Sequence, residues 1–185
     1  MISQRSWHDD WAGLHVAVLG LGKSGFSVAD TLCELGADVT VFAQSTNPQF
    51  TELLEVIGAK LVLSDSRASL EEIGQIDFAV ISPGFAPDHP TIQWLSQSGI
   101  PMLTDIDLAW RLRDKTDRVA KWITITGTNG KTTTTALTGR LVERAGRRVA
   151  VAGNIGPSLL DTLQAALDVS PGDPQGWPQV WVLEL

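Results

Sequence analysis

Residues 123–135 read Ile-Thr-Ile-Thr-Gly-Thr-Asn-Gly-Lys-Thr-Thr-Thr-Thr. The β-branched run predicts a strand that ends abruptly in a glycine turn, and Gly-Lys-Thr then opens a helix. This order is typical of a phosphate-binding loop, because free backbone N–H groups and the positive end of the helix dipole favour an anion at the turn. Lys131 can reach the β- and γ-phosphates of a nucleotide, and the Thr132 hydroxyl can ligate Mg²⁺.

The loop differs from the common Gly-x4-Gly-Lys-Ser/Thr pattern, whose first glycine would fall at Ile125. The turn is therefore a shorter variant that runs from Thr126 to Thr132. The alternative interpretation is a glycine turn before an ordinary helix. We favour the phosphate loop because the glycines follow a strand directly, which is the structural context that such motifs require.

Composition places the chain among globular proteins. Its 185 residues are 43% hydrophobic and 19% charged, and the net charge of −7 argues against binding to nucleic acid or to an anionic membrane surface. Cys33 is the only cysteine, so no disulfide can form within the chain, which fits a reducing compartment. We see no signal peptide and no run of about 18 apolar residues, and we expect a cytoplasmic protein without membrane contact.

Strands and helices alternate along the chain. We predict strands at 15–20, 38–43, 60–63, 77–82 and 100–103, separated by a helix that Gly36 ends and by helices at 52–57, 69–72 and 91–98. Ser69 and Glu72 are expected to form a capping box, and a further helix is expected at 105–113. After a charged segment at 114–118, we predict strands at 122–126, 149–152 and 180–185 and helices at 131–145 and 157–167.

This alternation predicts the α/β class with parallel sheets. We expect a Rossmann-like domain over residues 1–115, followed by the start of a P-loop α/β domain over residues 116–185. The second domain would leave sheet edges and apolar faces open, so we expect it to be truncated.

A second glycine-rich turn follows the first predicted strand. Gly20, Gly22 and Gly25 form a G-x-G-x-x-G fingerprint, which alone is a weak sign of dinucleotide binding. NAD would need an acid at the end of the next strand, where Ala43 and Gln44 stand with no acid nearby. We therefore expect a diphosphate that does not belong to NAD(P), and an NAD-linked oxidoreductase is disfavoured. The alternative is a tight turn that serves only helix–strand packing.

Three further positions are candidates for chemistry. Ser82, Pro83 and Gly84 lie at the carboxyl end of a parallel strand, where open α/β sheets bind ligands, although a plain turn is the simpler interpretation. Asn154 follows another strand and serves either a ligand or the turn itself. Glu184 stands in an apolar strand, where a carboxylate needs a partner or a metal; the alternative is an edge-strand residue that faces water.

These motifs together resemble those of the Mur ligase family, whose ATP loop also lacks the first glycine. Six motifs are shared in the family's order, at residues 20–25, 82–84, 104–108, 126–133, 153–156 and 182–185. The first three most resemble the branch of the family that adds D-glutamate. The resemblance covers nearly the whole chain from Leu14 onward.

The resemblance implies an enzyme that uses ATP and Mg²⁺ to join D-glutamate to UDP-N-acetylmuramoyl-L-alanine through an acyl phosphate. It implies UDP-substrate binding by Gly22, Lys23, Ser24, Ser82, Pro83, Gly84 and Asn154. It implies ATP binding by Gly127, Thr128, Asn129, Gly130, Lys131, Thr132 and Thr133. Lys131 and Glu184 would be catalytic, and Thr132 and Glu184 would hold Mg²⁺.

The family has three domains, and this chain matches the first and the opening part of the second. The family's later Mg²⁺-site histidine, its carbamylated lysine and its third domain have no counterpart here. We therefore expect the fragment to be inactive alone and the complete protein to be a monomer. Ala43 and Gln44 depart from an acid-plus-Thr pair near the uracil, which leaves the uracil contacts open. The alternatives are a non-catalytic module that binds UDP-sugar or ATP, and another family member such as the L-alanine-adding enzyme.

Overall fold

The computed structural model describes residues 5–46, 48–115, 119–153, 158–162, 165 and 177–185. The chain divides into two compact units, Met1–Leu112 and Arg113–Leu185, and each has its own parallel sheet. The α/β class predicted from the sequence is therefore confirmed.

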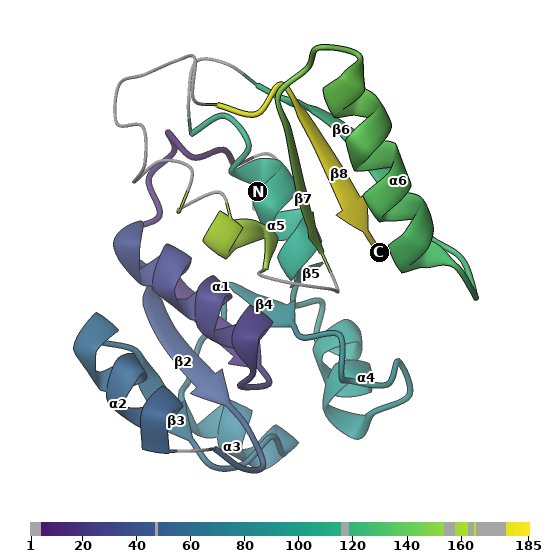
Figure 1. Ribbon diagram of the computed structural model, residues 1–185. Helices are drawn as coiled ribbons and strands as arrows, with labels where there is room; N and C mark the ends of the chain where they lie inside the picture. The colour runs from purple at the N-terminus through teal and green to yellow at the C-terminus, as the bar shows by residue number, and fades with distance from the viewer. Residues whose placement is uncertain (1–4, 47, 116–118, 154–157, 163–164, 166–176) are drawn as a thin grey trace. The chain divides into compact units, whose positions relative to one another are not determined.

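The first unit is a five-stranded parallel sheet with the strand order β3-β2-β1-β4-β5 (Figure 1). Its strands are β1 (His15–Leu19), β2 (Asp38–Phe42), β3 (Lys60–Val62), β4 (Phe78–Ile81) and β5 (Met102–Thr104). Its helices are α1 (Lys23–Glu34), α2 (Pro48–Ile57), α3 (Arg67–Glu72), α4 (Pro90–Gln97) and α5 (Asp105–Arg111). The order reverses between β1 and β4, and the crevice at the carboxyl ends of such a pair is where open α/β sheets bind ligands.

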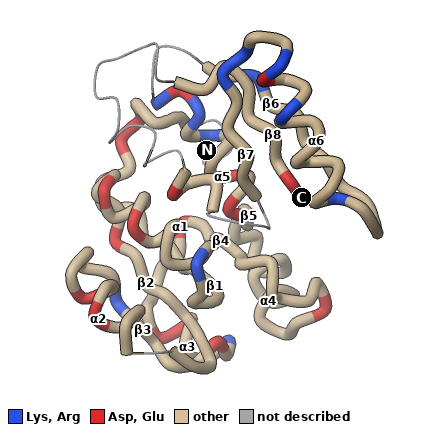
Figure 2. The backbone as a smooth tube through the Cα atoms, viewed as in Figure 1, with Lys and Arg blue, Asp and Glu red and all other residues tan. Residues whose placement is uncertain are grey.

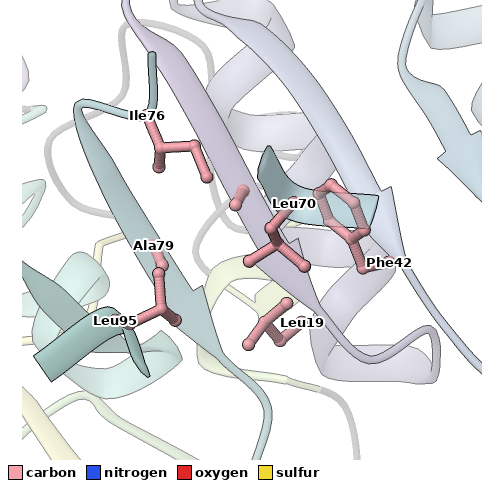
Figure 3. Close-up of a cluster of buried hydrophobic side chains, with 7 residues drawn as sticks. Leu19, Phe42, Leu70, Ile76, Ala79 and Leu95 are labelled. Carbon is pink, nitrogen blue, oxygen red and sulfur yellow. The ribbon is translucent and has the colours of Figure 1, made fainter. Parts of the chain in front are cut away.

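The core of the first unit explains why the central strands read as apolar runs. Strands β1, β2 and β4 are buried along nearly their whole length, as expected for parallel strands covered on both faces. One cluster of buried side chains is drawn in Figure 3 and comprises Ala17, Leu19, Phe42, Leu70, Ile76, Ala79 and Leu95. Leu70 belongs to α3 and Leu95 to α4, so this cluster anchors both helices to the sheet.

Two helices of the first unit show how local polar residues set helix starts. The Thr104 hydroxyl accepts from the Asp107 N–H, and the Asp107 carboxylate accepts from the Thr104 N–H, which makes a capping box for α5. Helix α3 begins at Arg67, with Ser66 as its N-cap accepting from the Ser69 N–H. The predicted capping box at Ser69 is therefore wrong, because a serine three residues earlier already caps the helix.

The second unit contains a three-stranded parallel sheet with the order β6-β8-β7. Its elements are β6 (Lys121–Ile125), α6 (Lys131–Arg144), β7 (Val149–Gly153) and β8 (Val180–Glu184). Strand β8 is thus the central strand, and α6 packs against β8 and β7. Several large apolar side chains remain exposed, as the sequence predicts for an incompletely covered sheet: Ile123, Leu137, Leu141 and Val151.

Residues 159–162 and 165 are helical, and the rest of the helix predicted at 157–167 lies mostly outside the described residues. Across the ranges that the structure describes, no helix combines the length and the apolar character that a membrane span needs.

Candidate functional site

The glycine turn after β1 and the loop after β4 lie against each other. The Ser82 N–H donates to the Leu19 carbonyl over 2.9 Å, and the Ser82 hydroxyl donates to the Gly20 carbonyl over 3.4 Å. Gly20 has a φ of +98°, and a Cβ built on it would stand 2.9 Å from the Cβ of Ser82. A side chain at Gly20 would therefore push the two loops apart. The structure brings together two segments that the sequence proposes separately as ligand sites.

The other two glycines of the turn have different surroundings. A Cβ at Gly25 would collide with the Gly20 carbonyl oxygen, so this glycine lets α1 approach the end of β1. Gly22 is exposed, and within the described part of the chain no atom lies within 4 Å of a Cβ built on it and no side chain caps α1. Gly22 therefore leaves room for a ligand beside the first backbone N–H groups of α1.

The remaining residues predicted for the UDP substrate take three positions. Lys23 is exposed and Ser24 is half-buried in the first turn of α1. Pro83 and Gly84 are exposed in the loop after β4. Asn154 lies outside the described residues, so its role stays a prediction.

The predicted phosphate loop joins β6 to α6. Gly130 is the N-cap of this 14-residue helix and has a φ of +74°, a left-handed conformation that favours glycine. The Lys131 ammonium donates to the Gly127 carbonyl over 2.8 Å, so the lysine folds back over the loop. Residues 127–130 and Thr133 are exposed. The loop thus presents backbone N–H groups and the positive end of a helix dipole to solvent.

Thr132 and Glu184 lie together at the carboxyl end of the second sheet. The Thr132 hydroxyl is 3.5 Å from Glu184 Oε1, the outer limit of a hydrogen bond. Only 5% of Glu184 is exposed, because β8 is central and places Ile125 and Gly153 opposite Glu184 on its two sides. This overturns the alternative of an edge-strand carboxylate that faces water.

The donors at this site fit Mg²⁺ bound together with nucleotide phosphates. A hydroxyl and a carboxylate oxygen are hard ligands, and Mg²⁺ in nucleotide sites takes one or two protein ligands while phosphates and waters complete its coordination. Among the described residues, no three His, Cys, Asp or Glu side chains are grouped as a metal site. Thr132 and Glu184 therefore fit a metal ion that binds together with a nucleotide.

An acid does lie near the end of β2, which corrects the sequence analysis. Gln44, which follows β2, donates from Nε2 to Asp65 Oδ1 over 3.3 Å. Asp65 follows β3, and because β3 is the parallel neighbour of β2 the two strands end at the same edge of the sheet. The signal was present in the sequence as an acid just after the third strand. An acid therefore stands beside the end of β2, where a dinucleotide ribose would need one.

A cavity of about 310 Å³ lies at the opposite edge of the second sheet, at the amino ends of β6 and β8. Lys121, Arg147 and Arg148 contribute to its lining, and Figure 2 shows Lys and Arg gathered around the end of α6 and the turn that follows. Among the described residues that line it, none is a predicted site residue. The candidate nucleotide site is therefore the exposed loop at the carboxyl edge.

Comparison with known families adds to this geometry. The family described as "Mur ligase MurD-like, N-terminal domain" matches residues 14–104, and the family described as "Mur ligase middle domain" matches residues 125–182. The two matches together cover most of the chain and include both glycine-rich turns. The chain belongs to the Mur ligase family.

Relatives of this Mur ligase chain carry a more specific name. A Leifsonia xyli subsp. xyli protein named UDP-N-acetylmuramoylalanine--D-glutamate ligase is 50% identical over 189 residues, which cover 97% of this chain and 35% of the relative. A Tropheryma whipplei protein of the same name is 50% identical over 161 residues, which cover 86% of this chain and 32% of the relative. This Mur ligase chain therefore spans about a third of the length of these relatives.

A solved Mur ligase structure shares the fold. The crystal structure of UDP-N-acetylmuramate:L-alanyl-gamma-D-glutamyl-meso-diaminopimelate ligase from Neisseria meningitides aligns with a TM-score of 0.53 and 20% identity, over 94% of this chain and 52% of that one. At this identity the likeness concerns the fold alone.

Proposed function

We propose that this chain is the UDP-substrate-binding domain and the first part of the ATP-binding domain of a ligase. The ligase joins D-glutamate to UDP-N-acetylmuramoyl-L-alanine in peptidoglycan precursor synthesis. The observation that carries the proposal is the 50% identity to the Leifsonia xyli relative over 97% of the chain, an extent that takes in both units. The geometry supports it, because each unit has a glycine turn and a helix N-terminus at the carboxyl edge of a parallel sheet.

In the first domain, residues 1–115, the diphosphate of the UDP substrate lies over Gly22 at the N-terminus of α1. Lys23 and Ser24 offer an ammonium, a hydroxyl and backbone N–H groups to the phosphates. The loop from Ser82 to Gly84 forms the other wall of this site. Asn154 lies outside the described residues and remains a predicted contact of the UDP substrate.

In the second domain, residues 116–185, the turn from Gly127 to Gly130 binds the ATP phosphates through backbone N–H groups, with Thr128, Asn129 and Thr133 alongside. Lys131 leaves the Gly127 carbonyl and turns to the β- and γ-phosphates, where it neutralises charge on the transferring phosphoryl group. Thr132 and Glu184 would hold Mg²⁺, which would neutralise further charge on the phosphates. Lys131 and Glu184 are the catalytic residues of this proposal.

The reaction is activation of a carboxylate followed by amide formation. The carboxylate of UDP-N-acetylmuramoyl-L-alanine attacks the γ-phosphate of ATP and gives an acyl phosphate and ADP. The amine of D-glutamate then attacks the acyl carbon through a tetrahedral intermediate and releases phosphate. The complete protein acts as a cytoplasmic monomer, without a nucleic-acid or membrane partner. We expect this chain alone to catalyse no reaction. The relatives are about three times as long, and their additional residues are needed to position the acyl phosphate and the amine.

A chimera tests the proposal, with this chain in place of the corresponding part of the Leifsonia xyli relative. We expect phosphate release that requires ATP, Mg²⁺, UDP-N-acetylmuramoyl-L-alanine and D-glutamate together. Lys131→Ala should abolish it. Lys121→Ala is the matched control, since this exposed lysine lies at the other end of β6, and it should leave the rate unchanged. A Lys131→Ala chimera with the parent kcat would contradict the assignment.

Two rival functions are separated by the same chimera. A non-catalytic nucleotide-binding module is the second candidate, because a glycine turn at a helix N-terminus in each unit would serve binding without turnover equally well. It would bind UDP or ATP and release no phosphate in any chimera. An L-alanine-adding ligase would instead release phosphate with UDP-N-acetylmuramate and L-alanine and would ignore D-glutamate.

A further inference from the structure

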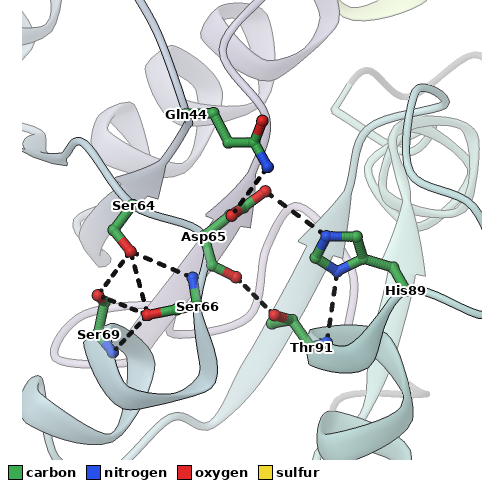
Figure 4. Close-up of polar contacts among 7 residues, drawn as sticks. All are labelled: Gln44, Ser64, Asp65, Ser66, Ser69, His89 and Thr91. Carbon is green, nitrogen blue, oxygen red and sulfur yellow. Dashed lines mark hydrogen bonds and ion pairs between the residues drawn. The ribbon is translucent and has the colours of Figure 1, made fainter.

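A polar cluster joins three segments of the first unit at the carboxyl edge of its sheet (Figure 4). Gln44 donates to the Asp65 carboxylate from the end of β2, and the Thr91 hydroxyl, from the first turn of α4, donates to the Asp65 backbone carbonyl. Asp65 Oδ2 lies 3.7 Å from His89 Nε2. The Asp65 side chain is 15% exposed and the His89 side chain 27%, so both are held inside this cluster. The connection from β3 to α3 is thereby fastened to the start of α4.

His89 is the N-cap of α4 through its side chain. Its Nδ1 accepts from the Thr91 N–H over 3.3 Å, and its Nε2 faces the Asp65 carboxylate. An imidazole that uses both nitrogens in this way has a fixed ring orientation. The orientation matters because the ring also touches the next segment of chain.

From His89 the contacts continue to the glycine turn. The His89 ring meets the Phe85 ring edge-on, with 5.0 Å between centroids and 77° between planes. The Phe85 N–H donates to the Ser82 carbonyl over 3.2 Å, and Phe85 Cε2 lies 3.3 Å from a Cβ built on Gly20. Phe85 therefore packs between His89 and the floor of the glycine turn.

We propose that His89 is a positioning residue for the UDP substrate. Held by Asp65 and by its cap to α4, it fixes the Phe85 ring, and Phe85 fixes the Ser82 loop against Gly20. The His89 ring therefore determines the position of the loops that form the diphosphate site, without contacting the ligand itself. This inference rests on the proposed function, because it takes the glycine turn to be the UDP site.

Two substitutions separate the ring from the cap. His89→Asn keeps an N-cap acceptor and removes the ring, whereas His89→Phe keeps a ring against Phe85 and removes the cap. We expect His89→Asn to retain nearly the parent Tm and to raise the Kd for UDP by about tenfold, as misplaced binding groups do. We expect His89→Phe to lower the Tm by several degrees and to raise the Kd less than His89→Asn does, because it keeps a ring against Phe85 but loses the two contacts that orient this ring. Thr104→Ala, which removes the cap of α5 without touching Phe85, is the matched control and should lower only the Tm.

The experiment is calorimetric titration of the 185-residue chain and its variants with UDP, together with thermal unfolding of each. A Kd that rises in step with the loss of Tm across all three variants would show a merely structural role and overturn the inference. So would parent-like UDP binding by His89→Asn, and in both cases the proposed function would stand. A parent chain that binds no UDP would overturn the UDP site of the proposed function, and the inference with it.

Discussion

Replacing Gly25 by alanine tests whether the glycine turn is built as the structure indicates. The alanine Cβ would meet the Gly20 carbonyl oxygen, which is backbone and cannot rotate away, so α1 would have to move off the end of β1. Overpacking of this kind costs about 3 kcal/mol, and the change from glycine to alanine inside a helix offsets about 1 kcal/mol of that. The free energy of unfolding of the first unit should fall by about 2 kcal/mol, which lowers its Tm by roughly 8–12 °C.

Gly22→Ala is the matched control, because within the described residues no atom lies near its Cβ and its φ of −132° suits any residue. It should cost at most about 1 kcal/mol, since alanine is a poor N-cap, yet it should weaken UDP binding by filling the space left for a phosphate. Thermal unfolding followed by far-UV circular dichroism and titration with UDP measure the two effects. An unchanged Tm for Gly25→Ala would refute the packing argument, and unchanged UDP binding by Gly22→Ala would refute the placement of the phosphate.

Three further predictions concern other parts of the chain. Glu184→Gln keeps the shape of the buried side chain, and in the chimera it should weaken ATP binding in the presence of Mg²⁺ by at least about tenfold. In EDTA, the variant and the parent chimera should bind ATP with the same Kd. The same Kd for both proteins with Mg²⁺ present would exclude Glu184 as a ligand. Burial, and to a lesser extent the charges of Asp30 and Asp38, raise the pKa of the Cys33 thiol to about 11. Iodoacetamide should therefore alkylate Cys33 slowly at pH 8 and faster as the pH approaches 11. An alkylation rate at pH 8 equal to that of free cysteine would contradict this prediction. Trp11→Ala should lower the free energy of unfolding of the first unit by about 3–5 kcal/mol, measured by urea unfolding. The reason is that Trp11 is 1% exposed, packs edge-on against Phe78 and donates its indole N–H to a backbone carbonyl. A loss under about 1 kcal/mol would show that the segment around Trp11 does not stabilise the first unit.

The sequence predicted the α/β class and nearly every element because its strands are continuous apolar runs bounded by glycine and proline. Helix starts were less accurate. Helix α2 begins at Pro48, four residues before the predicted start at Glu52, because proline is well suited to the first turn of a helix. The sequence pattern favours Ser69 at the start of α3, whereas Ser66 is the cap. Ser64, Ser66 and Ser69 lie close together in the sequence and offer alternative caps, and the packing of Leu70 into the core selects one of them.

Contacts between neighbouring strands could not be predicted from one sequence. Asp65 reaches Gln44 only because β2 and β3 are adjacent and parallel, and Glu184 is buried only because β8 inserts between β6 and β7. Strand order depends on how the helices pack, which no local pattern encodes. The motifs themselves were visible, because a glycine turn between a strand and a helix is a local feature.

We propose that the first unit binds a UDP-linked substrate at the turn formed by Gly20, Gly22 and Gly25. This binding is tested most directly by calorimetric titration of the 185-residue chain with UDP-N-acetylmuramoyl-L-alanine and, separately, with NADH. We predict one saturable site for UDP-N-acetylmuramoyl-L-alanine, from which UDP displaces this ligand, and no heat of binding for NADH. Tighter binding of NADH than of the UDP-linked ligand would contradict it.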